Sequence, residues 1–131
     1  MNDPLILDTN VFRNRDFLHK LEKHHGRKIL PAVAYAEICV LYLGKKNKSP
    51  KYVDTFLNKL DIEVDWLDQR RARDAAICCI NSGGNFSKNA RDYLIGAHAY
   101  PPPRTMITYN KEHFLFLGNR VYTPDEILKK I

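Results

Sequence analysis

Short apolar runs and amphipathic segments follow one another along the whole chain. The runs predict strands at residues 4–8, 28–31, 62–67 and 104–109, with a shorter one at 121–122. The segments between them have helical spacing, as where Val53, Phe56, Leu57 and Leu60 fall on one helix face. The predicted helices cover residues 11–26, 32–46, 50–60, 68–80, 89–99, 111–117 and 123–131.

This regular alternation of strand and helix predicts the fold class. Strands joined by helices pair in parallel, and the joining helices then cover both faces of the sheet. We therefore expect a three-layer α/β/α protein with a central parallel sheet of about four to five strands. The 131 residues contain no repeat, linker or low-complexity stretch, so residues 1–131 are expected to form a single domain.

Local signals predict several helix boundaries and faces. Ser49 before Pro50 is typical of a helix start, and Thr123 with Glu126 forms a capping-box pattern. The glycine-rich stretch 81–87 is expected to be a loop. In the helix at 68–80, the residues expected to face inward are Ala72, Ala75, Ala76, Cys79 and Ile80.

Charge and cysteine content narrow the function classes. The net charge of +6 and the pI of about 9.3 are compatible with a polyanionic partner such as RNA or DNA. The three cysteines form no CxxC pair, which argues against a zinc knuckle or a disulfide framework. No apolar run is long enough to span a bilayer and no signal peptide is recognisable, so we expect a cytoplasmic protein without membrane contact.

Polar residues stand where ligands gather in a parallel α/β sheet, beyond the carboxyl ends of the strands. Asp8 stands at the end of the first strand, and Thr108 and Asn110 stand at the end of the strand at 104–109. Glu37 is the only acid between Ile29 and Leu43. Asp92 begins an apolar helix, so three carboxylates are expected near one edge of the sheet.

Two interpretations of these acids stay open from the residues alone. A buried carboxylate needs compensation, and a hard cation such as Mg²⁺ or Mn²⁺ suits oxygen ligands. Alternatively, Asp8 is a helix N-cap and Asp92 interacts with a helix dipole. Glu37 fits that second interpretation poorly, because it stands inside an apolar helix where no cap is needed.

Four motifs in order resemble the PIN-domain family of small metal-dependent nucleases. They are "LILDTN" at residues 5–10, "YAEI" at 35–38, "ARDYLIGAHA" at 90–99 and "MITYNKEHF" at 106–114. They occur in the family's order and at similar separations, and the resemblance extends over nearly the whole chain, from about Leu5 to Thr123. The resemblance implies a PIN-like fold and metal-assisted hydrolysis of phosphodiester bonds.

Carried over residue by residue, the resemblance implies a catalytic site at Asp8, Glu37 and Asp92, which would also bind the metal together with Asn110. Three further residues would support that site, namely Thr9, Asn10 and Thr108. The chain departs from the family pattern in two places, because Asn110 is neutral and His113 stands where many members have an acid.

The resulting hypothesis is a Mg²⁺- or Mn²⁺-dependent endoribonuclease of the toxin type. Such a toxin is expected to cleave RNA, to be held inactive by a small antitoxin and to form a homodimer. Arg13 and Arg15 are candidates for binding the RNA backbone. His98 stands on an apolar predicted helix, which favours a packing role for this residue.

Three alternatives belong to other functional classes. One is a PIN-fold nuclease that processes ribosomal or transfer RNA with the same site. Another is a catalytically weakened PIN-fold binding or scaffold protein, which Asn110 and His113 favour. A phosphatase of the haloacid type also ends its first strand in aspartate, but it requires a second acid where this chain has Asn10.

Overall fold

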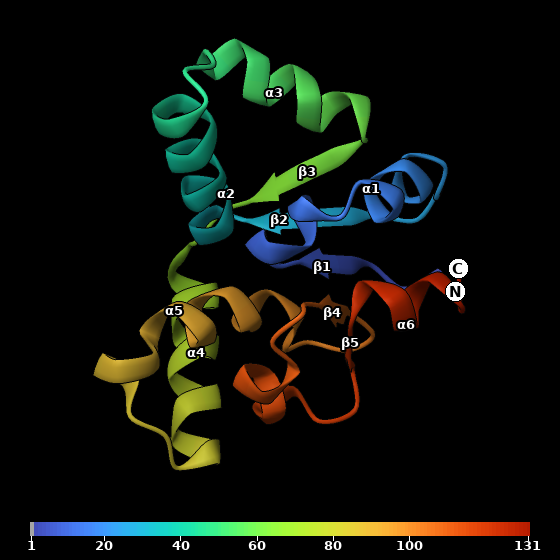
Figure 1. Cartoon of the computed structure of the whole chain (residues 1–131). Helices are drawn as coiled ribbons and strands as arrows, with labels where there is room; N and C mark the ends of the chain where they lie inside the picture. Colours follow the sequence, from blue (N-terminus) through green and yellow to red (C-terminus); the bar gives the residue numbers. More distant parts are fainter. Residues whose placement is uncertain (1) are drawn as a thin grey trace.

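The computed structural model describes residues 2–131 and is built around a five-stranded sheet (Figure 1). The strands are β1 (Leu5–Leu7), β2 (Lys28–Pro31), β3 (Ile62–Asp65), β4 (Thr105–Ile107) and β5 (Val121–Tyr122). They lie in the order β3-β2-β1-β4-β5, and every neighbouring pair is parallel. The predicted parallel α/β architecture is confirmed.

Helices flank this sheet. They are α1 (Arg15–Glu22), α2 (Ala32–Cys39), α3 (Pro50–Lys59), α4 (Gln69–Ser82), α5 (Phe86–Gly96) and α6 (Pro124–Leu128). The described residues also form three 3-10 segments, η1 (Thr9–Arg13), η3 (Ala97–Ala99) and η4 (Lys111–Leu117), and one π-helical segment, η2 (Val40–Lys45). α1 packs against α6, and α4 packs against α5 (Figure 1).

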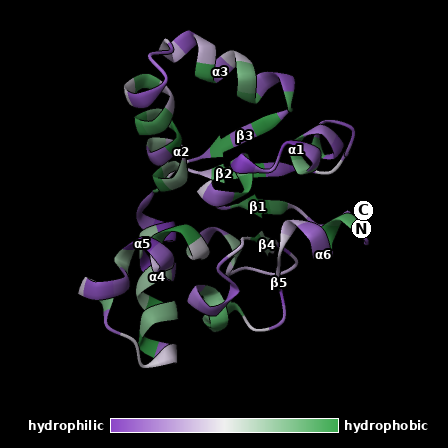
Figure 2. Ribbon diagram, viewed as in Figure 1, coloured by the Kyte–Doolittle hydropathy of each residue, from purple (hydrophilic) through white to green (hydrophobic). Residues whose placement is uncertain are grey.

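The centre of the sheet is the most buried part of the molecule. Leu5, Ile6 and Leu7 of β1 are fully buried, as are Ile29 and Met106 of the two neighbouring strands. Strands covered on both faces are apolar, and Figure 2 shows β1 and β4 as hydrophobic ribbon. Each such side chain contributes about 1.5–3 kcal/mol on burial, which fixes the position of the residues that follow β1.

The predicted helix at 11–26 is divided in two. The segment η1 ends at Arg13, and Asn14 starts α1 by accepting a hydrogen bond from the Phe17 backbone N–H. α1 ends at Glu22, before the expected Gly26. Asn14 therefore separates the residues after β1 from the first long helix.

The region around α4 differs from the prediction in its loop and in its buried face. α4 continues to Ser82 and ends at Gly83, whose positive φ of 68° suits glycine, so the connection to α5 is short. Ala75, Cys78 and Cys79 face inward, whereas Ala72 and Ala76 are exposed. The expectation for Ile80 was also wrong, because 75% of it is exposed. The face at 75, 78 and 79 packs against Tyr93 and Ala97, and this contact sets the rotation of the helix.

Two other helices end earlier than predicted. The α-helix predicted at 32–46 is regular only to Cys39 and continues as the π-helical turn η2. α6 ends at Leu128, although its capping box at Thr123 and Glu126 forms as predicted. Within residues 2–131, no helix is both long and apolar enough to cross a membrane.

All three cysteines are free, and they differ in accessibility. Cys39 is partly exposed, whereas Cys78 and Cys79 are buried. Burial raises the pKa of the Cys78 thiol to about 11. A reactive thiolate is therefore disfavoured at Cys78.

We predict that iodoacetamide labels Cys39 faster than Cys78 in the native protein at pH 8. Peptide mapping by mass spectrometry measures both rates, and unfolding in urea should remove most of the difference. Equal native rates would contradict the buried position of Cys78.

A second prediction compares identical substitutions at two isoleucines. Ile38→Ala removes a fully buried side chain and should lower the free energy of unfolding by about 2–5 kcal/mol. Ile80→Ala, on the exposed face of α4, should change it by less than about 0.5 kcal/mol. Urea denaturation followed by circular dichroism measures both, and a larger loss for Ile80→Ala would refute the observed rotation of α4.

Candidate active site

The strand order places a crevice between β1 and β4. From β1 the chain moves outward to β2 and β3, then returns to the other side of β1 to form β4 and β5. In open parallel sheets, ligands bind at the carboxyl ends of strands where the order reverses in this way. Asp8 follows β1 and Thr108 follows β4, so both stand at this position.

Asp8 is fully buried and held by three donors. The Thr108 hydroxyl donates to its Oδ2 at 2.7 Å, and the Thr9 backbone N–H donates to its Oδ1 at 2.7 Å. Arg91 supplies the third bond, at 2.8 Å from Oδ1. Asp8 is also the N-cap of η1, so the cap and the acidic-cluster interpretations are both observed at one residue.

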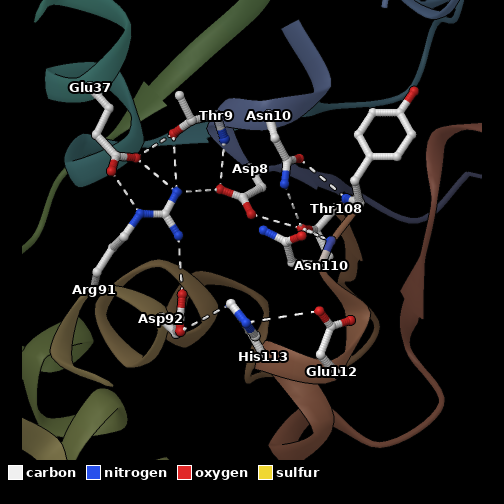
Figure 3. Close-up of polar contacts among 11 residues, drawn as sticks. Asp8, Thr9, Asn10, Glu37, Arg91, Asp92, Thr108, Asn110, Glu112 and His113 are labelled. Atoms are coloured by element: carbon white, nitrogen blue, oxygen red, sulfur yellow. Dashed lines mark hydrogen bonds and ion pairs between the residues drawn. The ribbon is translucent and has the colours of Figure 1, made fainter. Parts of the chain in front are cut away.

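Glu37 and Asp92 approach Asp8 from two different helices (Figure 3). Glu37 lies on α2, with 36% of its side chain exposed, and accepts a hydrogen bond from the Thr9 hydroxyl. Asp92 lies on α5, with 16% of its side chain exposed. Segments far apart in sequence therefore bring the three predicted carboxylates to one place.

Arg91 stands between the three carboxylates, and the sequence analysis missed it. Its Nη2 lies 2.8 Å from Asp8 Oδ1, its Nε lies 2.7 Å from Glu37 Oε2, and its Nη1 lies 3.1 Å from Asp92 Oδ1 (Figure 3). A second bond joins Nη2 to Glu37 Oε1 at 2.9 Å. A signal was present, because three converging acids need a positive charge and Arg91 directly precedes one of them.

The pKa values of this cluster follow from the same contacts. Burial alone raises the pKa of Glu37, but hydrogen bonds from Arg91 and Thr9, with the charge of Arg91, bring it below its ordinary value. Burial alone lowers the pKa of Arg91, but its bonds to Glu37 and the charge of Asp8 bring it above its ordinary value. Both groups are therefore charged at neutral pH.

Thr108 links the ends of β1 and β4 through hydrogen bonds. Its buried hydroxyl donates to Asp8 and also lies 3.0 Å from the Asn110 backbone N–H, which donates to it. The Asn10 side chain completes the link, donating to Thr108 at 3.4 Å and accepting from the Tyr109 N–H at 3.2 Å. The structure thus brings Asn10 and Thr108 to the positions expected of supporting residues.

A pocket of about 430 Å³ opens over the cluster. The residues around it come from η1, α2, α5 and η4, and they include Glu37, Lys88, Arg91, Asp92, Asn110 and His113. His113 Nδ1 lies 3.6 Å from Asp92 Oδ2. A larger pocket of about 570 Å³ lies around Lys20 and His24, and no acidic side chain is among the described residues that line it. The smaller pocket is therefore the candidate active site.

The predicted RNA-binding arginines lie apart from each other. The Arg13 guanidinium stacks over the ring of Tyr109, 4.7 Å from the ring centroid. Tyr109 directly precedes Asn110 in the sequence. Arg15 lines a separate pocket with Leu18 and Phe56. Arg13 is linked to the site only through Tyr109, whose backbone N–H donates to Asn10, and neither arginine is among the described residues that line the pocket over the acids.

His98 is buried, as its predicted packing role requires, and it is only partly paired. Its Nδ1 lies 2.7 Å from Asp65 Oδ2, while its Nε2 has no hydrogen-bond partner among the residues described. Burial lowers the pKa of His98, and the Asp65 contact offsets part of that effect.

The chemistry of the donor set suits a hard cation, but its present arrangement does not. Asp8, Glu37 and Asp92 offer carboxylate oxygens, and the amide of Asn110 stands beside them. Even so, no group of three or more His, Cys, Asp or Glu side chains in residues 2–131 is arranged to hold a metal ion. In this arrangement the Arg91 guanidinium lies between the acids (Figure 3). The residues therefore fit a cation once Arg91 has moved aside.

Comparison with known proteins shows the fold. No family model matches the sequence, and the curated proteins give no match. A chain of a toxin–antitoxin complex from Klebsiella pneumoniae is similar, with a TM-score of 0.68 and 21% identity over 93% of this chain and 98% of the other. A chain of DNA-bound VapBC from Salmonella typhimurium has a TM-score of 0.63 and 17% identity over 95% and 99%.

A chain of VapBC-1 from nontypeable Haemophilus influenzae gives a TM-score of 0.62 and 16% identity over 91% of this chain and 96% of the other. These similarities extend over nearly the full length of each chain. They confirm the PIN-like fold implied by the resemblance.

The Thr108 hydrogen bond to Asp8 gives a stability prediction. Thr108→Val keeps the shape but leaves a buried carboxylate oxygen without its donor, so it should cost about 1–3 kcal/mol. Thr55→Val, at an exposed position of α3, is the matched control and should change stability by less than about 0.5 kcal/mol. Urea denaturation measures both, and equal effects would refute the importance of this bond.

Proposed function

We propose that this protein is a Mg²⁺- or Mn²⁺-dependent endoribonuclease, the toxin of a toxin–antitoxin pair. The observation that carries the proposal is the convergence of Asp8, Glu37 and Asp92 at the switch point of the sheet, where Arg91 contacts all three and where Glu37 and Asp92 line a pocket. An acidic cluster at this position has no role in core packing, and although Arg91 compensates its charge, such clusters of ionisable groups are typical of functional sites.

The full-length similarity to three toxin–antitoxin complexes supports the toxin role. It also supports a small antitoxin as partner. The net charge of +6 supports RNA as substrate, because a basic domain attracts a polyanion. A homodimer and a cytoplasmic location are parts of the same proposal.

The proposed chemistry is hydrolysis without a covalent nucleophile. A divalent cation bound at the carboxylates would supply a Lewis acid that activates water and neutralises charge on the scissile phosphate. Asp8, fixed by Thr108 and the Thr9 N–H, would be the most rigid ligand. Glu37 is more exposed, so it could also orient the attacking water.

Other groups around the pocket suit the substrate. Lys88 lines it and would attract a phosphate oxygen, while the Asn110 amide offers an uncharged oxygen ligand. The Arg13–Tyr109 stack combines a positive charge with an aromatic ring, which suits an RNA strand, and the Tyr109 backbone N–H donates to Asn10 of the pocket lining. Arg15 is the weaker candidate because it lines another pocket.

Two alternatives use the same fold. An RNA-processing nuclease would share the site and differ only in its substrate. A catalytically weakened binding or scaffold protein is favoured by the neutral Asn110 and by the occupation of all three carboxylates by Arg91. That alternative requires a protein that neither binds Mn²⁺ nor cleaves RNA.

We predict that the purified protein cleaves single-stranded RNA with Mg²⁺ or Mn²⁺ and that EDTA stops the cleavage. Asp8→Asn should lower the rate by about 100-fold or more, equivalent to about 2.7 kcal/mol of transition-state stabilisation. Gel analysis of a labelled RNA measures the rate.

Asp125→Asn provides the matched control, because it makes the same substitution at an exposed position of α6. This variant should keep full activity. Melting temperatures must show that both variants are folded. Equal cleavage by the wild type and folded Asp8→Asn would refute the proposed site.

A further inference from the structure

Arg91 makes a separate bond to each of three carboxylates. Nη2 binds Asp8, Nε binds Glu37 and Nη1 binds Asp92, at 2.7–3.1 Å. The guanidinium thus occupies the position where positive charge is most needed, between acids from three different elements. It is a cation supplied by the chain itself.

Arg91 occupies several of the lone pairs that the three carboxylates can offer to a cation. Asp8 Oδ1 accepts from both Arg91 and the Thr9 N–H, and Oδ2 accepts from Thr108. Both Glu37 oxygens accept from Arg91, and one of them also accepts from Thr9. Asp92 Oδ1 accepts from Arg91, which leaves Oδ2 near His113. A carboxylate oxygen has about two lone-pair sites, so Asp8 Oδ1 has none left for a metal ion.

Arg91 therefore occupies carboxylate oxygens that a divalent ion would also use. Mg²⁺ takes its oxygen ligands at about 2.0–2.1 Å in a strict octahedral arrangement. It would need the same inward-facing oxygens that the guanidinium now holds. The two cations are alternatives at one site.

We propose that Arg91 and a divalent cation compete for the carboxylates of Asp8, Glu37 and Asp92, so that withdrawal of Arg91 controls metal loading. This inference rests on the proposed function for its metal, and it assigns to the chain its own inhibitory cation. The resting protein is then stable without metal, because the buried charge of Asp8 is already compensated.

The structure leaves Arg91 a route out. Its side chain is 38% exposed and lines the open pocket of about 430 Å³, so it can turn toward solvent without movement of α5. Asp8 cannot move in the same way, because Thr108 and the Thr9 N–H hold it from the protein side. Replacement of the Arg91 guanidinium by a metal ion thus requires a rotation of the Arg91 side chain.

The expected gain in Mn²⁺ affinity on removal of Arg91 depends on how often Arg91 is withdrawn in the wild type. Apparent affinity falls in proportion to the fraction of protein that is competent to bind. If Arg91 is withdrawn about 10% of the time, its removal should tighten Mn²⁺ binding about tenfold. A smaller withdrawn fraction gives a larger gain.

The test measures Mn²⁺ affinity by calorimetry for the wild type and for Arg91→Gln, with melting temperatures recorded with and without Mn²⁺. We expect Arg91→Gln to bind Mn²⁺ about tenfold more tightly or better. Without metal it should melt below the wild type, and Mn²⁺ should raise its melting temperature more. Adding Asp8→Asn to Arg91→Gln should remove the gain, which locates the binding at this site.

Arg73→Gln is the control for net charge, because Arg73 is exposed on α4 and the substitution is the same. It should leave Mn²⁺ affinity within about twofold of the wild type, well inside the tenfold effect predicted for Arg91. If Arg91→Gln does not fold without metal, Arg91→Lys keeps one charge that cannot reach three acids, and it should also tighten Mn²⁺ binding.

Affinity in the folded Arg91 variants that is equal to or weaker than the wild type would overturn the competition. RNA cleavage separates this failure from that of the proposed function. Wild-type cleavage without a gain in Mn²⁺ affinity would refute only the competition. A gain in Mn²⁺ affinity without cleavage by any variant would support the competition and refute the nuclease.

Discussion

The burial of one carboxylate, that of Asp8, constrains the rest of the site. β1 is fully buried at the centre of the sheet, so the residue after it is placed inside the protein and not in solvent. Leaving that charge unpaired would cost several kcal/mol. Thr108, the Thr9 N–H and Arg91 each donate to it, and they come from three separate parts of the chain. The site is the arrangement that makes this burial tolerable.

The topology explains why those donors meet. β4 returns beside β1, which brings Thr108 next to Asp8, and α5 carries Arg91 and Asp92 to the same strand ends. α2 follows β2 on the other side of β1 and presents Glu37. The same geometry that stabilises the fold therefore concentrates acidic groups in a pocket, and a cation is the natural complement of such a pocket.

Periodicity predicted the sheet and most helices because burial on both faces leaves a clear apolar pattern in β1, β2 and β4. It could not predict the rotation of α4, since alanine and cysteine fit both faces and only contact with Tyr93 selects one. The acids were found because strand ends are special positions in a parallel sheet. Arg91 was missed because its role depends on where three distant segments meet, and its position next to Asp92 alone does not identify its other two partners.

The central claim is that Asp8, Glu37 and Asp92 form one cation site. A crystal structure of the protein soaked in Mn²⁺, with anomalous scattering recorded at the manganese edge, tests this claim most directly. We expect an ion between the three carboxylates and an Arg91 side chain turned away from them. Crystals at saturating Mn²⁺ with no anomalous peak at this position, and with Arg91 still bound to all three acids, would contradict it.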